Sequence, residues 1–213
     1  MDNVDSPAKY IEDLQACLAR LPLSDIRAVI ALLQNARFDD RQVFIMGNGG
    51  SAATASHFAC DLGKGTAAPD RPRFRVTALT DSMALLSAYA NDFGYEHVFS
   101  EQLSNLLHPG DVVIGISGSG NSPNVLRALE LARRQGAITV GFSGFAGGKM
   151  KDMVDLCVVA PSSCMEQVED VHLILEHLVC SCLRQSEAAE RVPLPGIFAS
   201  QQRGSAPGGS SRR

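Results

Sequence analysis

The sequence predicts an α/β domain built on a doubly wound, five-stranded parallel sheet. Five short apolar runs recur along the chain, and amphipathic helical patterns separate them. Strands that alternate with helices in this way form parallel sheets, with helices covering both faces. Three of the runs are almost continuous in β-branched or large apolar residues, which is typical of strands buried on both faces. A length of 213 residues suits one such domain with a short appendage.

The predicted elements follow one another along the chain. A helical pattern first covers residues 7–36, with a possible helix cap at Leu23-Ser24-Asp25. Strands are predicted at Val43–Met46, Phe74–Leu79, Val112–Ile116, Ile138–Phe142 and Leu156–Val159. Helices are predicted between them at Ser51–Leu62, Ser82–Tyr89, His97–Leu107 and Pro123–Gln135, and a long last helix at Met165–Arg184.

These elements divide the chain into three parts. Residues 1–36 form an N-terminal helical segment whose apolar faces must pack on the domain or on a partner subunit. Residues 37–186 form the α/β domain itself. Residues 187–213 are rich in Gly, Ser, Pro and Arg, so we expect a disordered tail that buries too little apolar surface to offset its ordering.

Composition narrows the class of protein. Hydrophobic residues make up 45% and charged residues 20%, and the formal net charge is −4. This balance argues against a broad nucleic-acid surface, which needs clustered cations. The N-terminus has no signal-peptide pattern, and no stretch of the chain approaches the roughly 20 apolar residues of a membrane span, so we expect a cytoplasmic protein. The six cysteines show no CxxC spacing, which favours reduced thiols over a zinc knuckle or a disulfide framework.

Two glycine-rich loops follow predicted strands. The first is Met46–Ser51 and the second is Ser117–Ser122, and each precedes a helix. Ligands of open parallel sheets bind outside the carboxyl ends of the strands. Glycines let the backbone approach an anion closely, and helix N-termini favour negative charge.

The second loop adds three serine hydroxyls and contains no lysine. It therefore differs from a nucleotide-binding P-loop, and it suits a phosphate monoester held by many neutral donors. Either loop alone could be an ordinary turn with a helix cap. The recurrence of the pattern at two strand ends favours a phosphate site.

Five segments carry a family resemblance. They read GNGGSAATASHFACDL at 47–62, NDFGYEHVFS at 91–100, GDVVIGISGSGNSPNVLRAL at 110–129, GGKM at 147–150 and EDVHLILEHLV at 169–179. Together they resemble the phosphoheptose isomerases of the SIS (sugar isomerase) family over residues 8–185. The resemblance implies a SIS domain that converts sedoheptulose 7-phosphate to D-glycero-D-manno-heptose 7-phosphate. It also implies a homotetramer with sites between subunits and, as in several members, zinc.

The resemblance also implies roles for individual residues. Asp61 and His177 match the pair that moves a proton between adjacent carbons through a cis-enediol. His57, Asp61, Glu169 and His177 match the ligands of Zn²⁺ or a similar divalent metal. His57 and Asp61 are four residues apart on one helix face, and Glu169 and His177 lie about 80° apart around their helix. The substrate-binding positions are Asn48, Gly49, Gly50, Ser51, Asn91, Asp92, Ser117, Gly118, Ser119, Ser122 and Glu169.

Two positions depart from the family pattern. The catalytic Glu of the family is Asp61 here, and the Gln among its metal ligands is Glu169. These changes indicate a shifted substrate or an altered metal site. They also leave open a non-catalytic alternative, because one SIS relative binds the replication initiator DnaA, although it lacks the histidine that His177 matches. A sugar-phosphate-sensing transcription regulator is disfavoured. Such regulators carry a helix-turn-helix domain before the SIS domain, whereas here only about 40 residues precede the first strand and this segment is not basic.

Overall fold

The computed structural model describes residues 7–186 and 191–193. Its centre is a five-stranded sheet formed by β1 (Gln42–Gly47), β2 (Arg75–Ala78), β3 (Val112–Ile116), β4 (Ile138–Gly144) and β5 (Leu156–Ala160). The strand order is β2-β1-β3-β4-β5, and every neighbouring pair is parallel. The predicted fold class and all five strands are therefore confirmed.

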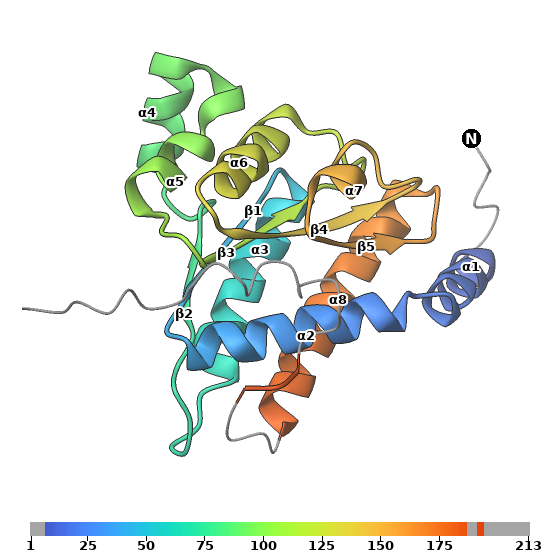
Figure 1. Ribbon diagram of the computed structural model, residues 1–213. Coiled ribbons are helices and arrows are strands. Elements are labelled where there is room, and N and C mark those ends of the chain that lie inside the picture. Colours follow the sequence, from blue (N-terminus) through green and yellow to red (C-terminus); the bar gives the residue numbers. More distant parts are fainter. Residues whose placement is uncertain (1–6, 187–190, 194–213) are drawn as a thin grey trace, which may run out of the picture.

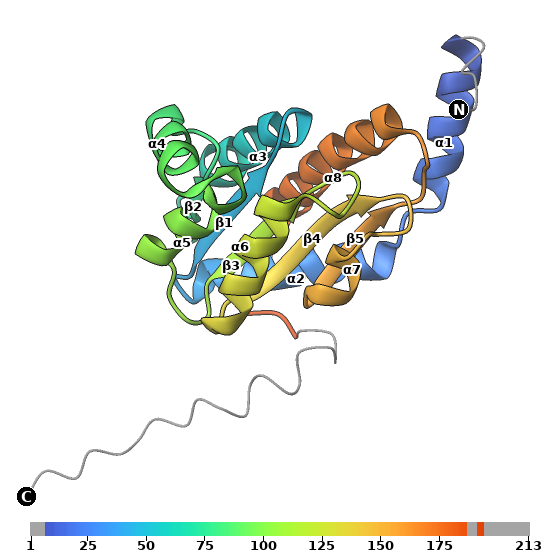
Figure 2. The same ribbon diagram turned by 90° about the horizontal axis from the view of Figure 1, so that it is seen from above.

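Helices cover both faces of the sheet (Figures 1 and 2). One face carries α2 (Leu23–Phe38), α3 (Gly50–Cys60) and α8 (Met165–Gln185). The other carries α4 (Met83–Phe93), α5 (Ser100–Leu106), α6 (Pro123–Arg134) and α7 (Met150–Met153). Alternate side chains of β1 enter the two cores, because Val43 and Ile45 pack with the first set and Phe44 and Met46 with the second.

The N-terminal helix α1 (Pro7–Ala19) is the least embedded element. Cys17 is its one buried residue, and 56% of the surface of Ile11 is exposed. Figure 2 shows the helix projecting beyond the β5 edge of the sheet. A hydrogen bond from the Tyr10 hydroxyl to Asp170 (2.5 Å) ties it to α8. The helix therefore has an apolar side that the rest of this subunit does not cover.

Most of the predicted C-terminal tail lies outside the described residues. Residues 191–193 are described, and they lie against α2. The backbone N–H of Val192 donates to Asn35 Oδ1 (2.9 Å), and Asn35 Nδ2 donates back to the carbonyl of Val192 (3.0 Å). Arg191 forms an ion pair with Asp39. This short piece thus has specific partners, which its composition did not indicate.

Three features of the observed fold are absent from the sequence prediction. A π-helical turn, Asp61–Gly65, continues α3, a 3₁₀ turn spans Tyr95–His97, and α7 is a single turn. Strand β2 is also shorter than predicted and only partly buried, because it is an edge strand. Among the helices of the described residues, none combines the length and apolar character needed to cross a bilayer.

Candidate active site

The two glycine-rich loops meet at the point where the strand order reverses. Strand β1 lies between β2 and β3, and Gly47 at its end pairs with Ile116 at the end of β3. The loops that follow these strands therefore leave the same edge of the sheet, side by side. This switch point is where ligands bind in open α/β sheets, so the structure brings the two predicted loops to one place.

The serine-rich loop folds as a tight turn in front of α6. The amide of Gly120 donates to the carbonyl of Ser117 (2.9 Å), and the hydroxyls of Ser117 and Ser122 lie 3.0 Å apart. The hydroxyl of Ser119 accepts from the amide of Asn121 (3.2 Å). Serine hydroxyls and the first amides of α6 are thus gathered at a helix N-terminus, which is a favourable place for an anion.

The segment with the sequence GGKM supports this loop through hydrogen bonds. The amide of Met150 donates to the carbonyl of Gly120 (3.0 Å), and that of Lys149 donates to Asn121 Oδ1 (3.1 Å). Gly120 has a φ of +64°, and a Cβ placed there would lie 2.1 Å from the carbonyl oxygen of Gly147. Only glycine fits this backbone-to-backbone contact.

Asn48 of the first loop connects it to α6. Its amide group exchanges two hydrogen bonds with the side chain of Asn124, at 2.9 and 2.8 Å. The Tyr95 hydroxyl also donates to Asn48 Oδ1 (2.9 Å). Asn124 and Tyr95 are therefore parts of the site that the sequence reasoning missed. Both lie within segments that carry the family resemblance, Tyr95 in NDFGYEHVFS and Asn124 in GDVVIGISGSGNSPNVLRAL, and could have been found there.

The other predicted substrate-binding residues occupy different surroundings. Gly49 (φ +55°) precedes the first turn of α3, which contains Gly50 and the buried Ser51. Asn91 and Asp92 lie on α4, a helix without buried residues, where Asn91 Nδ2 donates to Asp92 Oδ1 (2.8 Å). The two loops thus form one contiguous region, and the Asn91–Asp92 pair lies on a more exposed element.

A cluster of histidines and carboxylates lies between α3 and α8. It consists of His57 and Asp61 from α3 and its π-helical turn, together with Glu176 and His177 from α8. Each of the four offers one atom suited to a metal ion, and these atoms all lie within 4.8 Å of one another. The rings of His57 and His177 meet edge to face, with centroids 4.9 Å apart.

Glu176 is the buried member of this cluster. Its side chain is 0% exposed, while those of His57, His177 and Asp61 are 45%, 50% and 33% exposed. Glu176 Oε1 lies 3.4 Å from His57 Nδ1 and 3.1 Å from His177 Nε2. Neither contact has the angles of a hydrogen bond, so both carboxylate oxygens lack a hydrogen-bond partner. Burial, together with the nearby negative charge of Asp61, raises the pKa of Glu176 to about 7.

The observed cluster differs from the predicted metal set in one member, because Glu176 takes the place of Glu169. The carboxylate of Glu169 lies instead against Gly50, where an added Cβ would be 2.7 Å from Glu169 Oε2. Gly50 begins α3 and His57 lies seven residues later. Seven residues correspond to about 10 Å along a helix, so Glu169 lies at the loop end of α3 and Glu176 beside His57.

His172 lies in the interior next to this cluster. It is 1% exposed, and its Nε2 lies 3.1 Å from the carbonyl oxygen of Ser143. Burial lowers the pKa of this imidazole to about 4, although the hydrogen bond to Ser143 opposes the shift. The ring thus bonds to the backbone of β4. This histidine therefore belongs to the core.

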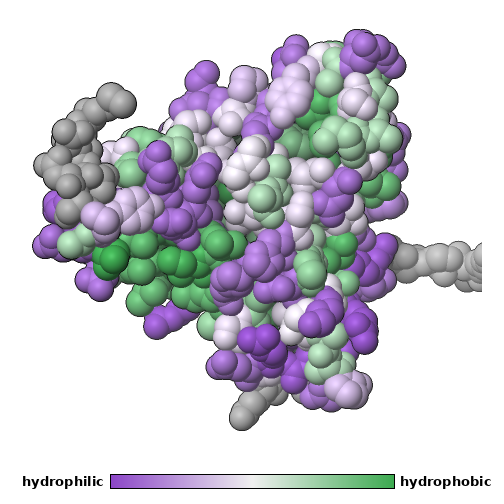
Figure 3. All heavy atoms as spheres, turned by 180° about the vertical axis from the view of Figure 1, so that it is seen from behind, coloured by the Kyte–Doolittle hydropathy of each residue, from purple (hydrophilic) through white to green (hydrophobic). Residues whose placement is uncertain are grey.

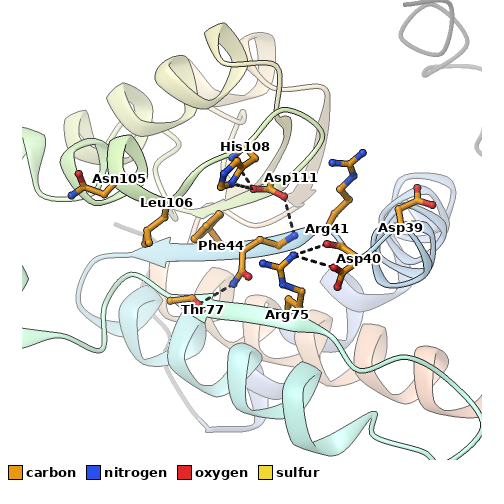
Figure 4. A pocket seen from close by; sticks show the side chains of 11 residues that line it. Asp39, Asp40, Arg41, Phe44, Arg75, Thr77, Asn105, Leu106, His108 and Asp111 are labelled. Atoms are coloured by element: carbon orange, nitrogen blue, oxygen red, sulfur yellow. Dashed lines mark hydrogen bonds and ion pairs between the residues drawn. The ribbon is translucent and has the colours of Figure 1, made fainter. Parts of the chain in front are cut away.

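A groove of about 720 Å³ opens at the opposite end of the sheet, where the strands begin (Figure 4). It is lined by residues at the amino ends of the strands, including Gln42, Arg75 and Asp111. Arg75 forms an ion pair with Asp40 here, and the carboxylate of Asp111 accepts from the amides of Gln42 and His108. None of the predicted site residues lines it. Its position, away from the carboxyl ends of the strands, sets it apart from the loop region.

Comparisons with known proteins show what this chain is similar to. A family model described as SIS domain matches residues 9–144. The phosphoheptose isomerase of Akkermansia muciniphila is 39% identical over 161 residues, which cover 76% of this chain and 85% of that protein. The phosphoheptose isomerase of Trichlorobacter lovleyi is 37% identical over 200 residues, covering 92% and 97%.

Solved structures give the same picture. Phosphoheptose isomerase GmhA from Neisseria gonorrhoeae superposes with a TM-score of 0.76 at 31% identity, covering 84% of this chain and 95% of that one. A phosphoheptose isomerase from Francisella tularensis gives a TM-score of 0.79 at 25% identity, covering 87% and 100%.

Proposed function

The chain belongs to the SIS domain family and, within it, to the phosphoheptose isomerases, so it is a sugar-phosphate isomerase, and we propose that it converts sedoheptulose 7-phosphate to D-glycero-D-manno-heptose 7-phosphate. The observation that carries this proposal is the meeting of two glycine-rich loops at the strand switch point, with a histidine–carboxylate cluster between α8 and the helix that begins at the first loop.

In this proposal the serine-rich loop binds the phosphate. Ser117, Ser119 and Ser122 and the first amides of α6 supply neutral donors, and the helix dipole adds a favourable field. Asn48–Ser51, Asn91, Asp92 and Glu169 are proposed to contact the sugar. Fixing the phosphate at one end of the sugar places the carbonyl end at a constant distance from the loop, and such positioning is a large part of catalysis.

Asp61 and His177 are proposed to carry the proton transfers. Asp61 takes a proton from C1 of the ketose while His177 gives a proton to O2, and the electrons of the C1–H bond form the C1–C2 double bond of a cis-enediol. His177 then takes the proton of O1, and Asp61 returns its proton to C2 to give the aldose. Both side chains are partly exposed, so substrate can reach them, and their general acid–base action would contribute about 100- to 10,000-fold.

A divalent cation is the proposed cofactor. Three of the side chains predicted as ligands, His57, Asp61 and His177, belong to the observed cluster, and imidazole with carboxylate suits Zn²⁺ or a similar ion. Such an ion, when bound, supplies Lewis acidity at the sugar carbonyl. The residues of the chain then orient the sugar and move its protons.

A homotetramer is the proposed assembly. Large apolar side chains remain exposed on α1, α4 and their neighbours, including Ile11 (56%), Leu23 (56%), Met83 (74%) and Phe93 (55%). Hydrophobic surface on the face in Figure 3 gathers in two regions, one on the side of α1 and one on the side of α4. Patches of this kind commonly mark subunit contacts. The six free thiols support a reducing compartment, for which we propose the cytoplasm.

A solvent-exchange experiment tests the proposed mechanism. When sedoheptulose 7-phosphate is incubated with the enzyme in D₂O, the aldose product should carry deuterium at C2, because the proton held by Asp61 exchanges with solvent. Asp61→Asn should slow both turnover and exchange by about 100- to 10,000-fold. Product formed with the original C1 proton fully retained and no exchange in recovered substrate would argue for direct hydride transfer and against the enediol.

A further inference from the structure

Glu176 is the most unusual ionisable group in the structure. Its side chain is fully buried, and both oxygens lack a hydrogen-bond partner. Among the described residues, no lysine or arginine forms an ion pair with it, and its charged-group contacts are the imidazoles of His57 and His177. A buried carboxylate without compensation is costly to a folded protein. Its burial therefore calls for a partner that the side chains of the subunit do not provide.

The surroundings of Glu176 are suited to a cation. Two imidazoles and a second carboxylate, Asp61, each place one atom within 4.8 Å of the others. A divalent ion at their centre would neutralise both carboxylates and accept the imidazole lone pairs. The half-exposed histidines leave one side of the cluster open, as in a metal site that must also receive a substrate oxygen.

We propose that Glu176 is a ligand of the divalent cation bound by this chain, together with His57, Asp61 and His177, and that Glu169 is not. This inference rests on the proposed function only in assigning the cation to the isomerase site. The family resemblance placed Glu169 in the metal set, so the proposal gives this chain a ligand that the resemblance does not provide.

The packing of α3 on α8 explains why Glu176, and not Glu169, lies in the cluster. The two helices lie side by side, with Glu169 against Gly50 and Glu176 against His57. Gly50 and His57 are seven residues apart on α3, and Glu169 and Glu176 are seven residues apart on α8. The two contacts are therefore separated by the same length along both helices. Glu169 therefore lies at the N-terminus of α3, where exposed amides favour a negative charge. Glu176 lies where the histidines are, on the same face of α8.

The shorter acid at position 61 fits the same account. Asp61 Oδ2 lies 4.0 Å from His57 Nε2, so this carboxylate reaches only the edge of the cluster. Glu176 Oε1 approaches both histidines more closely, at 3.4 and 3.1 Å. The carboxylate of Glu176, on α8, thus brings negative charge closer to the two histidines than the shorter side chain of Asp61 does.

Zinc binding by single variants tests the proposal. The affinity of the metal-free full-length protein for Zn²⁺ is measured by competition with a chromophoric chelator, and metal content is measured by mass spectrometry. Wild type should bind one Zn²⁺ per chain. Glu176→Gln should weaken binding by more than about 100-fold, since even an outer-shell partner typically contributes 10- to 100-fold. Glu169→Gln, a matched change on the same helix, should stay within about threefold. Glu176→Asp keeps the charge and serves if Glu176→Gln does not fold.

The outcomes separate this inference from the proposed function. Loss of zinc in Glu169→Gln with retention in Glu176→Gln would overturn the ligand assignment, and so would equal losses in both. Wild-type protein that binds no Zn²⁺, Co²⁺ or Mn²⁺ would also overturn it, yet turnover of sedoheptulose 7-phosphate by that protein would leave the isomerase proposal standing. If zinc is bound through Glu176 but sedoheptulose 7-phosphate is not turned over, the ligand assignment would stand and the isomerase proposal would fail.

Discussion

The structure predicts that the buried His172 makes the folded protein less stable in acid. The imidazole is 1% exposed, packs near Phe142 and bonds to the carbonyl of Ser143. Burial holds its pKa at about 4 in the folded protein, compared with 6.5 for a free histidine. We expect His172→Gln to make the protein less sensitive to acid, because glutamine can keep the hydrogen bond to Ser143 without titrating.

The sign and size of the effect follow from proton linkage. Between pH 6.5 and pH 4 the unfolded chain binds a proton at His172 that the folded chain does not bind. The free energy of unfolding therefore falls as the pH falls through this window. A shift of about 2.5 pKa units corresponds to about 3 kcal/mol, of which about 2 kcal/mol is lost by pH 5. Above pH 6.5 the group adds no pH dependence.

Urea unfolding at pH 7.5 and pH 5, at one fixed protein concentration, measures this contribution. Wild type should lose about 2 kcal/mol more than His172→Gln between the two pH values. His108→Gln makes the same chemical change at an exposed ring, and it should behave like wild type within about 0.5 kcal/mol. Equal pH dependence in wild type and His172→Gln would refute the reasoning, because it would mean that the buried ring accepts a proton without cost.

Three further predictions concern the loops and the acid at position 61. Gly120→Ala should weaken phosphate binding and lower stability by about 2–4 kcal/mol, because it combines a strained φ with overlap at Gly147; unchanged inorganic-phosphate affinity in calorimetry and an unchanged melting temperature would contradict this. Ser119→Ala should weaken sugar-phosphate binding by about 1–3 kcal/mol with the fold intact, and unaltered calorimetric affinity would count against that loop as the phosphate site. Asp61→Asn should lower kcat by about 100- to 10,000-fold with little change in substrate affinity, whereas a loss confined to KM would indicate a binding role.

The sequence was sufficient for the sheet and the loops because their signals are local. Each strand is a short, largely apolar run, and each phosphate-loop candidate is a glycine-rich cluster directly after one. The single-turn helix α7 and the π-helical turn at Asp61–Gly65 escaped prediction for the opposite reason. Segments of four and five residues are too short to show a helical period.

The composition of the histidine–carboxylate cluster was less accessible. Helical spacing places Glu169 and Glu176 on nearly the same face of α8, and the resemblance favoured the first. Which of them meets His57 depends on how α8 is positioned along α3, and this is a property of tertiary packing. The burial of Glu176 and the hydrogen bond of His172 to the β4 backbone have the same origin.

Turnover of sedoheptulose 7-phosphate is the measurement that tests the central claim most directly. The purified full-length protein is incubated with this ketose phosphate, with and without added Zn²⁺, and the products are identified by NMR. The account predicts an aldose, D-glycero-D-manno-heptose 7-phosphate, and its loss in Asp61→Asn and His177→Ala. A wild-type protein that binds this and several other sugar phosphates but isomerises none of them would contradict the account.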